Sequence, residues 1–257
     1  MGRTGRTTLL QDLRAQVARI ERRGMAPGAA TLPFEVPALD AALPEGGLAR
    51  GALHEACGAG ADAGYGAAAA LFAAGILARA GGPVLWVSEH FDLFAPALAG
   101  AGLDPERVLH VEAGRDVLLA MEEGLRHPGL SGVVGEVFGR LGLTASRRLQ
   151  LAAEATGAIA FTLRRSRKDS DASLAEPSAA VTRWRIACVP SAPPLPWAPD
   201  TPGLGRARWR LDLLRARGGV PASWIVEACD AQGRLALAAD LADRSAAPEA
   251  ERRRAAG

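Results

Sequence analysis

Segments typical of strands and segments typical of helices alternate between residues 52 and 163, and this alternation restricts the fold more than any other feature of the chain. Strands that are connected through helices pair in parallel, and the helices then cover the faces of the sheet. The sequence therefore predicts an α/β fold with a mostly parallel central sheet flanked by helices. The expected elements are strands at 52–56, 84–88, 108–112, 132–137 and 158–163 and helices at 67–80, 92–100, 117–126 and 144–156.

The alternation stops at residue 164. Residues 164–180 are polar and low in apolar content, so we expect a loop there. Three strand-like runs follow, and we expect them to join the sheet as antiparallel edge strands at 184–189, 207–214 and 224–228. Their tryptophans are expected to pack against the sheet edge (Trp184, Trp209 and Trp224).

An amphipathic helix is predicted over residues 7–23, ahead of the α/β body. Its apolar residues recur at helical spacing and form one stripe (Leu9, Leu13, Val17 and Ile20). Residues 24–31 contain Pro27 and Gly28 and are expected to act as a flexible link. The stripe is a candidate interface with a second copy or another protein, and packing onto the chain's own core is the alternative.

Charge is unevenly distributed behind the formal net charge of +2. Residues 1–23 carry +4 and residues 140–168 carry +6, whereas residues 24–139 carry −9. Basic segments that flank an acidic centre suit contact with an anionic or acidic partner, and a solvated surface is the alternative. The three widely spaced cysteines, the lack of a signal peptide and the lack of an uninterrupted apolar run of membrane-spanning length indicate a cytoplasmic protein with no membrane contact.

A glycine-rich segment from Gly58 to Gly66 follows the first strand of the alternation and precedes an alanine-rich helix. This is the context of a phosphate-binding loop, in which a lysine contacts the phosphates and a serine or threonine holds Mg²⁺. No lysine, serine or threonine lies between Glu55 and Ser88, and the only lysine in the chain is Lys168. Asp62 adds a charge that repels phosphate. The sequence therefore predicts no nucleotide cofactor and no catalytic residues, and the loop glycines are interpreted as a relic (Gly58, Gly60, Gly64 and Gly66).

Three stretches resemble the core of RecA-type proteins. Residues 32–55 resemble the entry to that core, residues 84–90 resemble the strand that ends in its catalytic glutamate, here Glu89, and residues 132–137 resemble its Walker B strand with a displaced acid. Together with the Trp-Arg pairs at 184–185 and 209–210, the pattern over about residues 8–240 closely resembles the ImuA family. The resemblance implies a RecA-like domain at 32–244 with a degenerate nucleotide loop. Residues 1–31 are expected to form the N-terminal helix and link, and residues 245–257 a disordered tail.

The resemblance also implies a function. ImuA proteins are RecA-like proteins of bacterial SOS mutagenesis operons, encoded with ImuB, a Y-family polymerase relative without catalytic carboxylates, and with an error-prone C-family polymerase. The expected role is a non-catalytic adaptor in damage-induced translesion synthesis, with RecA and DNA as further candidate partners. Two alternatives stay open: an active RecA/KaiC-like ATPase whose loop uses arginine, and a SulA-like inhibitor of cell division.

Basic residues near the predicted loop are candidates for contact with DNA or a partner (Arg147, Arg148, Arg164, Arg165, Arg167 and Lys168). In RecA-like proteins, to which the chain is similar, the loop after the fifth strand faces DNA. Asp169, Asp171 and Glu176 weaken the attraction for phosphate. Trp197 lies among prolines and is a candidate anchor for a docked peptide.

Histidines and cysteines suggest a metal site only superficially. His54 and Cys57 are spaced as in zinc motifs, but no companion pair exists, and the strand alternation places neighbouring ligands on opposite faces. His90 and His110 are far away in sequence. We therefore expect no metal at these residues.

Overall fold

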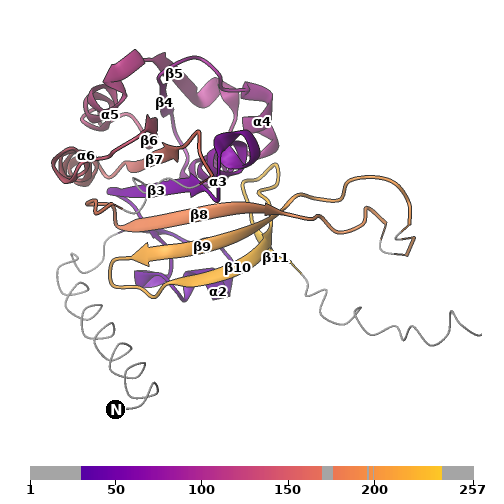
Figure 1. The fold of residues 1–257 in the computed structure, drawn as a ribbon. Coiled ribbons are helices and arrows are strands. Elements are labelled where there is room, and N and C mark those ends of the chain that lie inside the picture. The colour runs from indigo at the N-terminus through magenta and orange to yellow at the C-terminus, as the bar shows by residue number, and fades with distance from the viewer. Residues whose placement is uncertain (1–29, 170–175, 196, 199, 239–257) are drawn as a thin grey trace, which may run out of the picture.

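The computed structural model describes residues 30–169, 176–195, 197–198 and 200–238. The predicted helix at 7–23, the link up to residue 29 and the predicted tail at 245–257 lie outside the described residues. The described part has a central sheet of nine strands and a separate two-stranded sheet (Figure 1). The strands are β1 (Thr31–Leu32), β2 (Leu48–Ala49), β3 (Ala52–Gly58), β4 (Val84–Ser88), β5 (Val108–Glu112), β6 (Gly132–Phe138), β7 (Ile159–Arg165), β8 (Thr182–Val189), β9 (Arg208–Ala216), β10 (Ala222–Glu227) and β11 (Ala236–Leu237).

Helices cover both faces of the parallel half of this sheet. Helices α3 and α4 lie on one face and α5 and α6 on the other (Figure 1). The α-helices are α2 (Pro37–Asp40), α3 (Asp62–Ala80), α4 (Ala95–Gly100), α5 (Val117–Leu125) and α6 (Leu143–Thr156), and three short 3₁₀ turns are at Pro44–Gly46, Pro105–Arg107 and Gly114–Asp116.

The strand order in the large sheet is β11-β10-β9-β8-β3-β7-β6-β4-β5. The strands from β8 to β5 pair in parallel, and β9, β10 and β11 continue the sheet in antiparallel fashion. The predicted mostly parallel sheet with antiparallel C-terminal strands is thus confirmed. One detail differs, because β8 is an inner strand parallel to β3, not an antiparallel edge strand.

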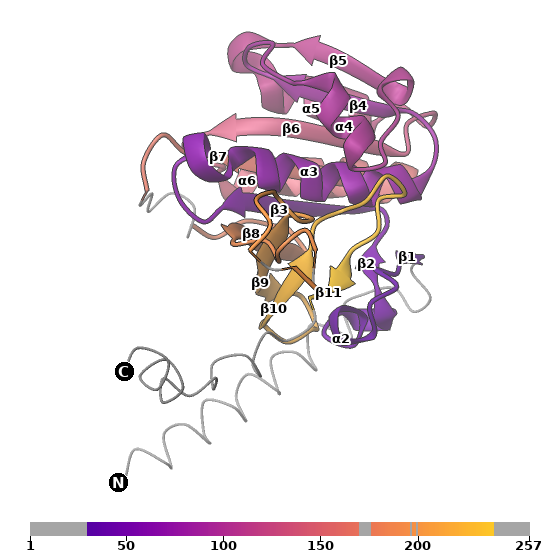
Figure 2. The same ribbon diagram turned by 90° about the vertical axis from the view of Figure 1, so that its right-hand side faces the viewer.

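Small residues let α3 lie close to the sheet and its neighbours. Figure 2 shows this helix running across the sheet, and its alanines pack with Phe72 against aromatic side chains such as Trp184. A Cβ at Gly75 would lie 2.3 Å from the Sγ atom of Cys229, so only glycine fits there. By length and composition α3 is also long and apolar enough to cross a membrane, contrary to the expectation that no apolar run of the sequence reaches that length. More than half of that stretch is buried in the domain, as in a core helix.

Several predicted boundaries move, and two of these changes concern the predicted loops. Helix α3 begins at Asp62 and not at residue 67, so Gly64 and Gly66 are helical and are not part of a loop. Strand β7 continues to Arg165, so Arg164 and Arg165 are also not in a loop. Both shifts have the same cause: the polar groups at these ends find partners inside the protein, which allows regular structure to continue.

Candidate functional site

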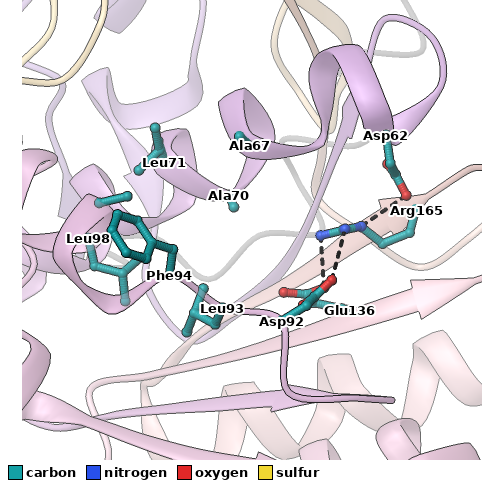
Figure 3. A pocket seen from close by; sticks show the side chains of 11 residues that line it. Asp62, Ala67, Ala70, Leu71, Asp92, Leu93, Phe94, Leu98, Glu136 and Arg165 are labelled. Carbon is teal, nitrogen blue, oxygen red and sulfur yellow. Dashed lines mark hydrogen bonds and ion pairs between the residues drawn. The ribbon is translucent and has the colours of Figure 1, made fainter.

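The candidate site lies at the carboxyl ends of the parallel strands, beside the first turns of α3. In open α/β sheets this edge is where ligands bind. A groove of about 270 Å³ opens there between α3 and the segment from Asp92 to Leu98 (Figure 3). We call it the α3/α4 groove. Its lining consists of Asp62, Ala67, Ala70, Leu71, Asp92, Leu93, Phe94, Ala97, Leu98, Glu136 and Arg165.

The side-chain alternation of strands brings the polar residues of the groove together. On β7, Phe161 and Leu163 face α3, so Arg165 faces α3 as well, whereas Arg164 points to the opposite face. On β6, Val134 faces α3, and Glu136 therefore does too. Since β6 and β7 are neighbours, the Glu136 carboxylate and the Arg165 guanidinium meet at the N-terminal end of α3.

Arg165 is held by three carboxylates. Its Nε donates to Asp62 Oδ2 at 3.0 Å, its Nη1 donates to Glu136 Oε2 at 2.8 Å, and its Nη2 lies 3.6 Å from Asp92 Oδ2 (Figure 3). The indole Nε1 of Trp86 donates to the other oxygen of Glu136 at 2.9 Å. The guanidinium is therefore fixed inside the protein and is not presented to a ligand.

Burial and charge oppose each other in this cluster. Burial raises the pKa of Glu136, and the Arg165 guanidinium and the Trp86 N–H limit that rise because they favour the carboxylate. Burial also acts to lower the pKa of Arg165, but the carboxylates of Glu136 and Asp62 outweigh it and raise that pKa overall. The cluster is best described as a charged pair with Asp62 as a second counter-ion.

The glycines of the loop make room for a tyrosine. A Cβ at Gly58 would lie 2.6 Å from the Cβ of Tyr65, and a Cβ at Gly60 would lie 3.0 Å from its ring. The distance at Gly58 is too short for any other residue, and the distance at Gly60 would require the Tyr65 ring to shift, so the packing of Tyr65 explains Gly58 and favours glycine at position 60. The predicted relic of a phosphate loop thus has a structural use of its own.

Backbone N–H groups at the start of α3 are bonded within the chain. Ala61 N–H donates to Asp169 Oδ1 at 3.3 Å, and Asp62 N–H donates to the carbonyl oxygen of Ser166 at 2.8 Å. Ala59 N–H donates to the carbonyl of Ile186 at 2.9 Å. These are groups that a phosphate-binding loop would offer to its ligand. Here a carboxylate and two carbonyls hold them.

Glu89 lies where the sequence analysis placed it, directly after β4. It is half-buried and lines a second depression of about 390 Å³ together with Phe138, Arg165, Arg167 and Lys168. The carboxylate that the structure places against α3 is Glu136, the displaced acid of the strand at 132–137. Sequence reasoning missed its pairing with Arg165, although strand alternation predicts that Glu136 shares a face with Val134.

The six basic candidates do not form one surface. Arg164 is buried, donates to the carbonyl of Gly139 at 2.6 Å and lies 3.9 Å from Glu55 Oε2, and Arg165 is held in the groove. Arg147 and Arg148 are exposed on α6, and Arg148 pairs with Glu122 at 2.6 Å. The last two candidates, Arg167 and Lys168, are exposed after β7, and the Arg167 guanidinium lies 5.2 Å from the centre of the Phe138 ring.

Other predicted residues are spread through the fold. His54 is buried, with Nδ1 2.8 Å from Thr182 Oγ1 and Nε2 2.9 Å from the carbonyl of Ala49, and burial lowers its pKa to about 4. No group of potential metal ligands exists among the described residues. Trp197 is 80% exposed. The strand tryptophans pack in the core rather than at a sheet edge, because β8 is an inner strand: Trp184 and Trp209 are buried, and Trp224 packs against the core.

The sheet order, the helix α3 that follows its central strand β3, and the site at the strand ends define a RecA-like α/β protein. Among solved structures the RadB recombinase matches with a TM-score of 0.57 and 15% identical residues, over 81% of this chain and 100% of that chain. This likeness shows the fold.

Sequence comparison identifies the family. No protein-family model matches the chain. Protein ImuA of Caulobacter vibrioides, from strains NA1000 and ATCC 19089, is 41% identical over 236 residues, which covers 86% of this chain and 95% of the relative. The chain belongs to the ImuA family.

Proposed function

We propose that this protein is a non-catalytic RecA-fold adaptor in damage-induced, error-prone translesion DNA synthesis. It works in the cytoplasm with an ImuB-type inactive polymerase, and through that protein with an error-prone C-family polymerase. RecA, DNA and a second copy of the chain are further proposed partners. Family membership supports the biological setting.

One observation carries the non-catalytic part of the proposal. The place where a phosphate-binding loop would hold its ligand is taken by the chain's own groups: Arg165 between Asp62 and Glu136, and the N–H groups bonded to Asp169 and Ser166. A triphosphate would have to displace these contacts without the lysine and the metal-holding hydroxyl that stabilise the bound triphosphate in a phosphate-binding loop. Binding of Mg-ATP is therefore strongly disfavoured.

Calorimetry and co-purification test the proposal together. Titration of the purified chain with Mg-ATP is expected to give no heat of binding in the micromolar range. Co-expression with the ImuB-type protein is expected to give a complex that survives size-exclusion chromatography. Micromolar ATP affinity would overturn the non-catalytic assignment, and failure to form the complex would overturn the adaptor assignment.

A nucleotide hydrolase is the second candidate, and the position of Glu89 at the end of β4 favours it. The two candidates differ in what Glu89→Gln does to damage-induced mutagenesis. An adaptor without a nucleotide has no water for Glu89 to activate, so mutagenesis stays at the wild-type level. A loss of more than about tenfold in a variant that still folds would favour the hydrolase.

A further inference from the structure

The α3/α4 groove has two chemically different ends. One end is apolar, with Leu71 of α3 on one side and Leu93, Phe94 and Leu98 on the other (Figure 3). Phe94, which lines the groove, is 69% exposed. Large aromatic side chains left open to water at the rim of a concave site mark a surface that contacts another molecule.

The other end of the groove is acidic. Asp62, Asp92 and Glu136 face a single cation, Arg165, which leaves a formal charge of −2. Asp62 and Glu136 are nearly buried and engaged with Arg165. The side chain of Asp92 is 60% exposed and is 3.6 Å from the guanidinium, so its carboxylate has acceptor positions left for a group that arrives from outside.

Size and charge together restrict the occupant. Pockets that enclose small-molecule ligands usually have about 300–1,000 Å³, and the volume here, about 270 Å³, is just below that range. Phosphates and carboxylates are repelled by the acidic end. A chemically matched occupant has an apolar side chain for the leucines and Phe94 and a cation for Asp92.

We propose that the α3/α4 groove is the docking site for a segment of the partner polymerase-like protein that presents a bulky apolar side chain with an arginine or lysine close by. This inference rests on the proposed adaptor function and adds the chemistry of the contact. The apolar side chain enters between α3 and Phe94, and the basic group binds Asp92 at the open end.

Two pairs of variants on the full chain test the groove in the complex. Ala67 is exposed on α3 and lines the groove, whereas Ala63 is exposed on the same helix outside it. Ala67→Trp is expected to weaken binding of the ImuB-type protein by about tenfold or more, and Ala63→Trp by less than about twofold. The second pair tests the charge of the groove. Asp92→Arg is expected to weaken binding by about tenfold or more, and Glu106→Arg, a charge reversal at an exposed position outside the groove, by less than about twofold.

A charge exchange then identifies the bound segment. Overlapping peptides of the partner are titrated against the full chain by fluorescence anisotropy, and the binding peptide is expected to carry arginine or lysine beside a bulky apolar residue. Changing that basic residue to Glu is expected to abolish binding to the wild type and to restore it with Asp92→Arg. Circular dichroism of each variant confirms that the fold is kept.

The outcomes separate the groove from the adaptor function. If the wild type binds the partner and Ala67→Trp binds equally well, the groove proposal is wrong and the adaptor function stands. If the wild type binds no partner, both are wrong. A binding peptide without a basic residue, or displacement of the partner by a peptide of this chain's own residues 7–23, also overturns the assignment of the occupant.

Discussion

The guanidinium of Arg165 holds the charged groups at the N-terminal end of α3 together. Arg165 bonds Asp62 and Glu136, and both carboxylates are largely buried. Removing one partner of such a pair leaves charge in a poorly solvated place, which costs far more than the pair gains over an apolar equivalent. The arginine therefore holds the carboxyl ends of β6 and β7 against the first turn of α3.

Replacing Arg165 is expected to destabilise the domain. Arg165→Met should lower the free energy of unfolding by about 3 kcal/mol at pH 7, and Arg167→Met, at an exposed position, by less than about 0.5 kcal/mol. Without the arginine the raised pKa of Glu136 rises further. A carboxyl group whose pKa is raised in the folded state stabilises the fold fully below its ordinary pKa of 4.5, and this stabilisation is lost as the pH rises through the folded-state pKa. The variant should therefore become more stable as the pH falls from 8 to 5. Urea unfolding across this range is the measurement, and pH-independent destabilisation would contradict it.

His54 gives the fold a second dependence on pH. Burial lowers the pKa of His54 from 6.5 to about 4, and the hydrogen bond to the Ala49 carbonyl offsets this shift only in part. The unfolded chain takes up a proton at this histidine below pH 6.5, and the folded chain does not until about pH 4. The free energy of unfolding should therefore decrease as the pH falls from 6.5 to about 4, by up to about 3 kcal/mol. Denaturant midpoints of the wild type and His54→Gln, compared from pH 7 to pH 5, should converge as the pH falls.

At the scale of elements, the strand–turn–helix unit at β3 and α3 shows how far the sequence could be read. The order of strand, glycine-rich turn and helix was predictable from the sequence, and the lack of a phosphate-loop lysine could be read directly from it. The start of α3 was not, because Gly64 and Gly66 suggest a loop locally, while Asp169 and Ser166 satisfy the N–H groups that permit an earlier start. These partners are more than a hundred residues away, where no local pattern reports them.

The glycines of this unit are expected to behave in opposite ways. A Cβ at Gly58 would lie 2.6 Å from Tyr65 Cβ, whereas at Gly64 nothing lies within 4 Å. Gly58→Ala should cost about 2 kcal/mol or more in the free energy of unfolding, because two backbone-anchored groups must separate. Gly64→Ala should add about 0.5–1 kcal/mol, because alanine favours the helix interior. Urea unfolding of both variants is the measurement. Equal effects of the two substitutions would show that the packing of Tyr65 does not require glycine at position 58.

Strand β7 shows the same limit. The basic pair Arg164-Arg165 suggests a solvated loop, yet both residues lie in the strand on opposite faces of the sheet. Each finds a carboxylate on a neighbouring element, Glu55 for Arg164 and Glu136 for Arg165. Composition alone could not distinguish a paired arginine from a free one, because pairing depends on strand order. Once the order β3-β7-β6 is known, alternation predicts both partners.

For the whole molecule, the alternation of strands and helices was enough to predict the parallel sheet and its covering helices, and the strand-like runs after residue 180 predicted the antiparallel C-terminal strands. It did not predict that β8 inserts beside β3, because the long segment between β7 and β8 gives no sign of its direction. The candidate groove was also not predicted. Part of its apolar wall comes from α4 and the residues before it, where the sequence predicted a helix over 92–100 and gave no sign of a groove.

The predicted helix at residues 7–23 is the last part of the molecule to be tested, and it lies outside the described residues. Its stripe of Leu9, Leu13, Val17 and Ile20 would contribute about 6–10 kcal/mol if fully buried, before the costs of association and ordering. We expect Leu13→Asp with Val17→Asp to disrupt association with a second copy, RecA or the ImuB-type protein, and to leave the α/β domain folded. Light scattering and pull-down measure the association, and circular dichroism measures the fold. Loss of the fold would show that the stripe belongs to the core, and unchanged association with an intact fold would show that it is not an interface.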